Sequence, residues 1–211
     1  KTPPTYLRAW ETALFVEDSF SPWRWMRFSA GMRATQFSIE DQDFSSFEPR
    51  LSTVIELGES TDLRASYTKM RQYIHMLASN GVGLPNDIWI PASEFSPPQN
   101  SRQWTLGMTR KLSNSSFMLK LSMEGYYKQS SNLIEPVLGT NFMDIRESNW
   151  EGYIYTNGEG RSRGIELLVE AENQLFNGWI SYTLSSSDRK FSSLNNGDWY
   201  PSRYDRRHNF S

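Results

Sequence analysis

Residues 25–35 read WMRFSAGMRAT, and this stretch decides the fold. Alternate positions from Met26 to Ala34 are apolar, whereas the positions between them, from Arg27 to Thr35, are polar or glycine. Because successive side chains of a β-strand point to opposite faces, these two sets lie on opposite sides of a sheet. A helix would not separate them so cleanly. The stretch is therefore predicted to be a strand with one apolar and one polar face.

Further stretches repeat this alternation, and short turn sequences join them in pairs. Two strands connected by so short a turn form an antiparallel hairpin. The predicted pairs are 9–18 with 25–37 around a turn at 20–23, 50–57 with 63–68 around 58–61, 103–109 with 117–124 around 112–116, and 165–171 with 179–184 around 176–178.

The connections between the hairpins are longer than the turns within them. Soluble domains give no reason for short and long connections to alternate, whereas outer-membrane barrels have short periplasmic turns and long extracellular loops. The stretches are also long for soluble strands and suit a tilted membrane crossing. The predicted fold is all-β, an antiparallel up-and-down transmembrane β-barrel, of which this chain supplies about eight to nine strands. The long connections lie at roughly 39–46, 70–100, 129–160 and 188–204.

Side-chain chemistry supports a membrane setting. Aromatic rings flank the short turns, as expected where apolar rings with polar edges meet the membrane–water interface; these are Phe20, Trp23, Trp25, Phe117, Phe176 and Trp179. The predicted inward face is charged, which a packed soluble core would not accept but a water-filled lumen would. The predicted lumen-facing residues are Arg27, Arg33, Arg50, Arg64, Glu166 and Glu170, with Lys120 and Glu124 beside them.

The composition narrows the function classes. The 211 residues include 22 Lys and Arg against 24 Asp and Glu, so no basic surface points to nucleic acid. Cysteine is absent, which excludes disulfides and thiolate metal sites. A mean hydropathy of -0.62 suggests a water-soluble protein, but barrels that alternate faces also look polar on average. A soluble β-sandwich with one wet face is the structural alternative.

No motif in the sequence indicates catalysis. His75 and His208 are the only histidines, and neither lies in a metal-binding spacing. The acidic run 40–43 lacks the continuation of a calcium loop, and no serine lies in a nucleophile-elbow pattern. We therefore predict no enzyme activity, no cofactor and no metal site.

Several short motifs resemble the barrel of TonB-dependent outer-membrane receptors, especially those of Bacteroidetes. Their order and spacing match over essentially the whole chain. The motifs are FVED at 15–18, WRW at 23–25, FEPRLS at 47–52, LPNDIWIP at 84–91, GYYK at 125–128, GRSRGIE at 160–166 and YDRRHN at 204–209.

The resemblance implies a barrel of about 22 strands with a plugged lumen. It also implies import of a scarce nutrient, such as an iron chelate, cobalamin or a glycan, with energy from the TonB system. Residues 1–211 are then expected to form part of one barrel domain, without the plug domain and the barrel-closing strands. The implied partners are outer-membrane lipid, the TonB complex through the N-terminal part, a small-molecule or oligosaccharide substrate, and in some members a surface lipoprotein.

The connection at 70–100 is the predicted place for substrate contact. It combines aromatic and polar side chains with prolines, which suits sugars or siderophores; the candidates are Tyr73, Asn86, Asp87 and Trp89. The alternative for each of them is packing among the loops. Alternative functions are a passive porin, an adhesive surface barrel or a soluble β-rich glycan-binding module.

Overall fold

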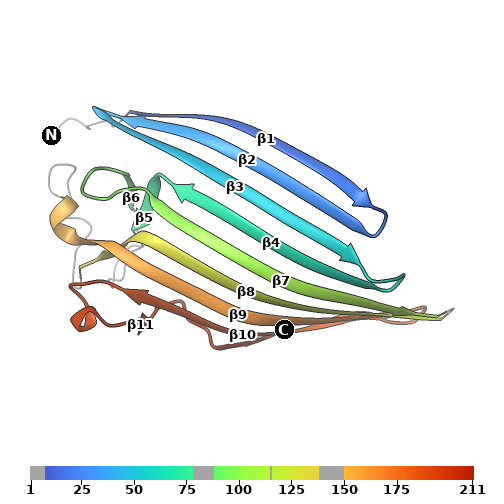
Figure 1. The fold of residues 1–211 in the computed structure, drawn as a ribbon. Coiled ribbons are helices and arrows are strands. Elements are labelled where there is room, and N and C mark those ends of the chain that lie inside the picture. Colours follow the sequence, from blue (N-terminus) through green and yellow to red (C-terminus); the bar gives the residue numbers. More distant parts are fainter. Residues whose placement is uncertain (1–7, 78–87, 115, 138–149) are drawn as a thin grey trace.

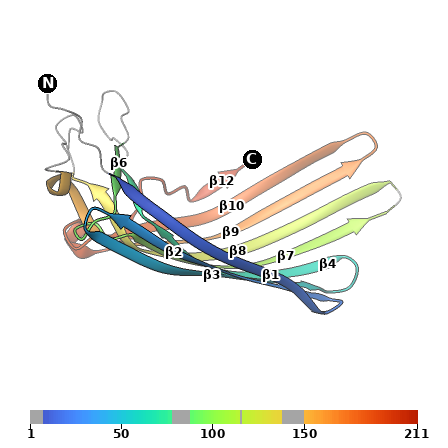
Figure 2. The ribbon, with the colours of Figure 1, turned by 90° about the horizontal axis from the view of Figure 1, so that it is seen from above.

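The computed structural model describes residues 8–77, 88–114, 116–137 and 150–211. In this part of the chain a ten-stranded antiparallel sheet dominates, bent into an open trough (Figures 1 and 2). Eight strands are long: β1 (Ala9–Trp23), β2 (Met26–Ile39), β3 (Gln42–Glu56), β4 (Thr61–Gln72), β7 (Gln99–Ser113), β8 (Phe117–Pro136), β9 (Ile154–Asn173) and β10 (Asn177–Lys190).

The remaining elements are short. β11 (Tyr200–Pro201) and β12 (His208–Phe210) both pair with β10, and β5 (Ile74–Leu77) with β6 (Ile88–Pro91) forms a separate two-stranded sheet. Two 3-10 helices complete the described chain, η2 (Trp150–Tyr153) and η3 (Asn195–Gly197). None of the described helices has the length and apolar character needed to span a membrane.

Each long strand pairs with its neighbour in sequence, except that β4 pairs with β7 across the β5–β6 excursion. The predicted up-and-down antiparallel order and the number of long strands are therefore confirmed. The expected ninth strand is represented by the short strand β12, which begins at His208. The chain turns sharply at one end of the sheet, here called the short-turn end; the other is the long-connection end.

The prediction that short and long connections alternate along the chain was wrong at one place. β2 and β3 meet at the long-connection end through only Glu40 and Asp41, with Glu40 in the left-handed region at φ 51°. The acidic residues suggested a loop, yet the period of two continues through Phe37 and Phe44, which pair across the hairpin. Packing of these two rings against the β4–β7 connection keeps the strands regular to their ends.

Two strand boundaries were also wrong. β1 continues to Trp23, so the first turn is Arg24 and Trp25 instead of 20–23. β9 begins at Ile154, so the sequence at 157–160 that reads as a turn lies within a strand. Asn157 takes a φ of 56° there, which lets the strand absorb an irregularity in its pairing with β8.

Register assigns every long-strand side chain to one of two faces. One row of paired residues runs Arg27, Val54, Arg64, Gly107, Glu124, Glu166 and Thr183, and it lies on what we call the polar face. The next row runs Thr53, Ala65, Leu106, Gly125, Ile165 and Leu184, on the apolar face. Leu106 is 65% exposed, so the apolar face has no protein cover in the described residues.

Among the residues that the structure describes, the buried hydrophobic ones gather at the long-connection end. One cluster joins Phe37 and Ile39 of β2 to Tyr73, and the other contains Leu77, Ile90, Ile134 and Ile154. The β5–β6 excursion is thereby packed against the polar face, because Phe37 and Ile39 point to that side. The middle of the sheet has no such core on either face among the described residues.

Candidate functional site

The six charged residues predicted to face the lumen share the polar face. Arg27, Arg33, Arg50 and Arg64 lie on β2, β3 and β4, and their register positions match in parity. Glu166 and Glu170 lie on β9 and reach the same face through the β7–β8–β9 pairing. Of these six residues, the basic ones therefore lie on β2, β3 and β4 and the acidic ones on β9.

Three of these six charges have an ion-pair partner within the described chain, and that of Arg64 with Asp62 is long at 4.0 Å. An Arg33 nitrogen lies 2.8 Å from Glu11 Oε1, and Lys120 Nζ lies 2.6 Å from Glu170 Oε2. All four side chains are about 35–42% exposed, so these pairs add little stability. Arg27, Arg50 and Glu166 have no ion pair in the described residues and are exposed. Such a face requires water or a polar partner beside it.

A buried polar network lies on the polar face near the long-connection end. Glu48 is 5% exposed and accepts a 2.7 Å hydrogen bond from Ser46 Oγ. Ser46 Oγ in turn accepts a 2.8 Å hydrogen bond from the Tyr73 hydroxyl. The network ties β3 to the first residue of the β4–β7 connection. Sequence reasoning missed Glu48, although the FEPR motif contains it.

Tyr73 therefore packs inside the protein in this structure. It is 5% exposed, and its ring stacks on Phe37 with the centroids 4.9 Å apart. Trp89, on β6, is by contrast 63% exposed and open to a ligand. Asn86 and Asp87 lie outside the described residues. Substrate contact by the last three stays a prediction.

His75 is fully buried in the same connection. Gln99 Nε2 lies 2.9 Å from His75 Nδ1 and can donate to it, which leaves the ring proton on Nε2, facing the Ser96 carbonyl oxygen at 3.4 Å. Burial lowers the pKa of His75 from its ordinary value, and the hydrogen bond to Ser96 offsets only part of this effect. The ring is neutral and acts as a structural cross-link between β5 and the start of β7.

A hollow of about 210 Å³ opens beside this connection. Its lining mixes amide, charged and apolar groups, and Arg189 forms an ion pair with Glu135 across it. Gln72, Gln99 and Arg189 all hold polar-face positions at the ends of their strands. Sequence reasoning did not find this hollow, because its residues come from five strands and a connection that are distant in the chain.

An apolar outer face and a charged inner face define the wall of a transmembrane β-barrel, with a hollow among the packed connections at one end. A family model described as TonB dependent receptor-like, beta-barrel, matches residues 1–211. The chain belongs to this family, which comprises transporters and receptors of the bacterial outer membrane and not enzymes. The predicted family and location are confirmed, whereas the Bacteroidetes affinity stays a prediction.

A solved structure shows the same fold. The alcaligin outer membrane receptor FauA from Bordetella pertussis superposes with a TM-score of 0.59 at 17% sequence identity. The match covers 97% of this chain and 33% of that receptor, so the chain spans about a third of its length. A comparison with curated protein sequences gives no match.

Proposed function

We propose that the chain is a central part of the barrel of an active importer, which takes up a scarce nutrient with energy from the TonB system. The observation that carries this proposal is the β4–β7 connection, which packs on the charged face through Tyr73 and Phe37. A passive porin needs an open lumen, whereas an importer needs a binding mouth above it. A plug domain, the closing strands and contact with TonB belong to the rest of the proposed receptor.

The substrate class we propose is a small polar chelate or oligosaccharide. The hollow is lined by the amides of Gln72 and Gln99, by the ion pair of Glu135 and Arg189, and by an apolar wall from Leu133. Trp89 supplies an exposed aromatic ring nearby on β6. Such a mixture suits iron chelates, cobalamin or glycans, because each presents hydrogen-bonding groups around a partly apolar body. A surface lipoprotein that covers this mouth is a further proposed partner.

Uptake by cells that express the complete receptor tests this function. Ferric siderophores, cobalamin and oligosaccharides are offered separately in radiolabelled form, before and after an uncoupler collapses the proton gradient. We expect one class to accumulate and its accumulation to stop with the uncoupler. Uptake that continues after the uncoupler would identify a passive porin, and no uptake of any class would contradict an import role.

A charge-reversal pair tests the hollow itself. Arg189→Glu leaves Glu135 facing a second carboxylate, so it is expected to raise the nutrient concentration needed for half-maximal uptake. The double variant Glu135→Arg with Arg189→Glu restores the ion pair in reverse and is expected to recover part of the affinity. Equal uptake by the wild type, the single variant and the double variant would show that the hollow takes no part in transport.

A further inference from the structure

The apolar face changes character abruptly near the long-connection end. On β4 the outward residues are Leu63, Ala65 and Tyr67, followed by Lys69 and Arg71. On β7 the order toward the same end is Met108, Leu106, Trp104 and then Arg102. On β9 it is Leu167, Ile165, Arg163 and Arg161. On each of these strands, an apolar or aromatic outward residue is followed at the next outward position by a basic one.

These transitions lie at the same level on β4 and β7, and on β9 the first basic residue, Arg163, already pairs with Tyr127. Tyr67, Trp104 and Tyr127 pair in one row, with ring centroids 5.5 and 6.0 Å apart. The next row toward the long-connection end is Lys69, Arg102, Gln129 and Arg161. Since aromatic rings mark the edge of the hydrocarbon region, the basic row lies at the level of lipid headgroups.

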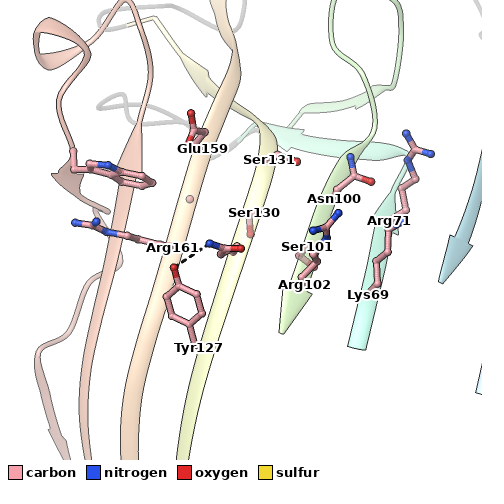
Figure 3. A pocket seen from close by; sticks show the side chains of 13 residues that line it. Lys69, Arg71, Asn100, Ser101, Arg102, Tyr127, Ser130, Ser131, Glu159 and Arg161 are labelled. Atoms are coloured by element: carbon pink, nitrogen blue, oxygen red, sulfur yellow. Dashed lines mark hydrogen bonds between the residues drawn. The ribbon is translucent and has the colours of Figure 1, made fainter. Parts of the chain in front are cut away.

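The basic side chains surround a hollow of about 620 Å³ (Figure 3). Lys69, Arg71, Arg102 and Arg161 line it from β4, β7 and β9, against one acidic residue in the lining, Glu159. The Trp199 ring closes one side, with the Arg161 guanidinium carbon 4.3 Å from the ring centroid. The site is therefore concave and carries a net positive charge.

Three of these four cations have no acidic partner in the described residues. Lys69 and Arg102 form neither an ion pair nor a side-chain hydrogen bond there, and Arg71 donates a 2.5 Å hydrogen bond to the neutral carbonyl of Ser45. Only Arg161 is paired, with Asp188 Oδ2 at 3.0 Å from its Nε. The hollow thus presents unneutralised positive charge, which favours an anion.

A second hollow adjoins the first on its apolar side. Its volume is about 700 Å³, and Leu106, Met123, Ile165 and Leu184 supply its lining. Gly125 forms its floor, because a Cβ added there would meet only two carbonyl oxygens, both at 3.9 Å. Tyr127 borders both hollows. A charged pocket therefore continues directly into an apolar groove of the lipid-facing wall.

We propose that these joined hollows bind a phosphorylated lipid of the outer leaflet. Its phosphate lies among Lys69, Arg102 and Arg161, and an acyl chain follows the groove over Gly125. Charge complementarity selects the headgroup, and the apolar groove selects a molecule that carries hydrocarbon beside its phosphate. This lipid site lies on the outer wall of the barrel, and the proposal for it does not depend on the proposed import function.

The position of the site argues against other anions. Lys69, Arg102 and Arg161 lie on the face opposite to Arg27 and Glu166, so a solute inside the barrel does not reach them. A free phosphate ion would use the basic hollow alone and gain nothing from the groove. Binding of inorganic phosphate and binding of the lipid therefore respond differently when the groove is filled.

Binding to the complete receptor, purified in a neutral detergent, tests the proposal. The probes are bis-phosphorylated lipid A, the same lipid without phosphates, and inorganic phosphate, with bound lipid counted by native mass spectrometry. Each basic residue near an anionic lipid contributes about fivefold to affinity, so Lys69→Gln with Arg102→Gln is expected to weaken the phosphorylated lipid by about 25-fold. The lipid without phosphates should bind weakly to both proteins.

Three further variants separate the contribution of the basic residues from that of the apolar groove. Arg64→Gln with Lys128→Gln removes the same charge from the polar face of β4 and β8 and should leave lipid binding unchanged. Gly125→Leu fills the groove and should weaken the lipid while leaving any binding of inorganic phosphate unchanged. Heat-modifiable migration in gels checks that each variant is folded, and Lys69→Arg with Arg102→Lys, which keeps both charges, should retain the lipid.

Four results would overturn the proposal. The first is equal lipid binding by the wild type and the folded variant Lys69→Gln with Arg102→Gln, and the second is equal binding of the lipid with and without phosphates. The third is lipid binding that does not change in Gly125→Leu. The fourth is association of two receptor copies through this face in place of lipid. Loss of transport without loss of lipid binding would contradict only the proposed function.

Discussion

His75 is fully buried between β5 and the start of β7, where Gln99 and the Ser96 carbonyl hold its ring neutral. Its pKa is lowered in the folded protein, whereas the unfolded segment titrates near the ordinary value of 6.5. As the pH falls below 6.5, the unfolded segment takes up a proton before the folded one does. Stability that the neutral ring provides above 6.5 is therefore lost progressively below it.

Acidification is accordingly expected to open the packed part of the β4–β7 connection. Hydrogen exchange at residues 73–77 of the complete receptor, taken relative to the intrinsic rate at each pH, should accelerate between pH 7 and 5, while exchange in the middle of β8 should keep its normal pH dependence. His75→Gln stays neutral and can keep a hydrogen bond to Gln99, so its profile should lack the extra acceleration. The same acceleration in both proteins would show that another group is responsible.

Single residues also show what local sequence can predict. The shared face of Arg27, Arg64 and Glu166 was predictable, because the period of two depends only on neighbouring residues. The burial of Tyr73 was not, since it depends on Phe37 and Ser46, which reach it through the pairing of three strands. The basic hollow escaped prediction for the same reason: Lys69 and Arg102 become neighbours only through strand register.

Adjacent residues of one strand provide a direct test of which face meets lipid. Leu167 and Leu168 are the same residue type on β9, with Leu167 on the apolar face beside Met123 and Leu168 on the polar face beside Ser122. Leu167→Arg places a cation near the middle of the apolar band and should destabilise the folded receptor by about 2–4 kcal/mol. Leu168→Arg joins an already charged surface and should cost much less.

Denaturant unfolding of the complete receptor in lipid vesicles gives both free energies under identical conditions. The residue type, the strand and the introduced charge are matched, so the difference reports the environment of each face. Equal losses for the two variants would contradict the assignment of the faces, and a larger loss for Leu168→Arg would reverse it.

Element boundaries were predictable where turn residues are distinctive. The β3–β4 turn contains Gly58 at φ 76°, and its place was predicted from Gly58 and Ser60. The β2–β3 turn uses Glu40, which has no such signature, and the acidic residues around it resembled a loop. Hydrophobic pairing between Phe37 and Phe44 decided the length of these strands, and the pairing is visible only once the hairpin is formed.

The whole molecule is an open sheet with two unlike edges. The outer edge of β1 has no strand partner in the described residues, whereas the outer edge of β10 is partly covered by β11 and β12. Unpaired strand edges favour association with other chains. Barrel closure requires further strands, and no local pattern in these residues specifies their number.

The 211-residue chain on its own is therefore expected to associate after refolding in detergent. Size-exclusion chromatography with light scattering should show oligomers or larger species for this chain and a single monomeric species for the complete receptor. A folded, monodisperse monomer of the isolated chain would show that its edges are protected and would contradict the need for closing strands.

β8 continues well past Tyr127, where its apolar outward residues end, and remains paired with β9 up to Pro136. At the antiparallel rise, these last residues extend about 30 Å along the strand. The β8–β9 ribbon therefore continues as a paired framework beyond the apolar band of the sheet. Changes of sequence in this outer part of the ribbon leave untouched the part that must remain compatible with the membrane.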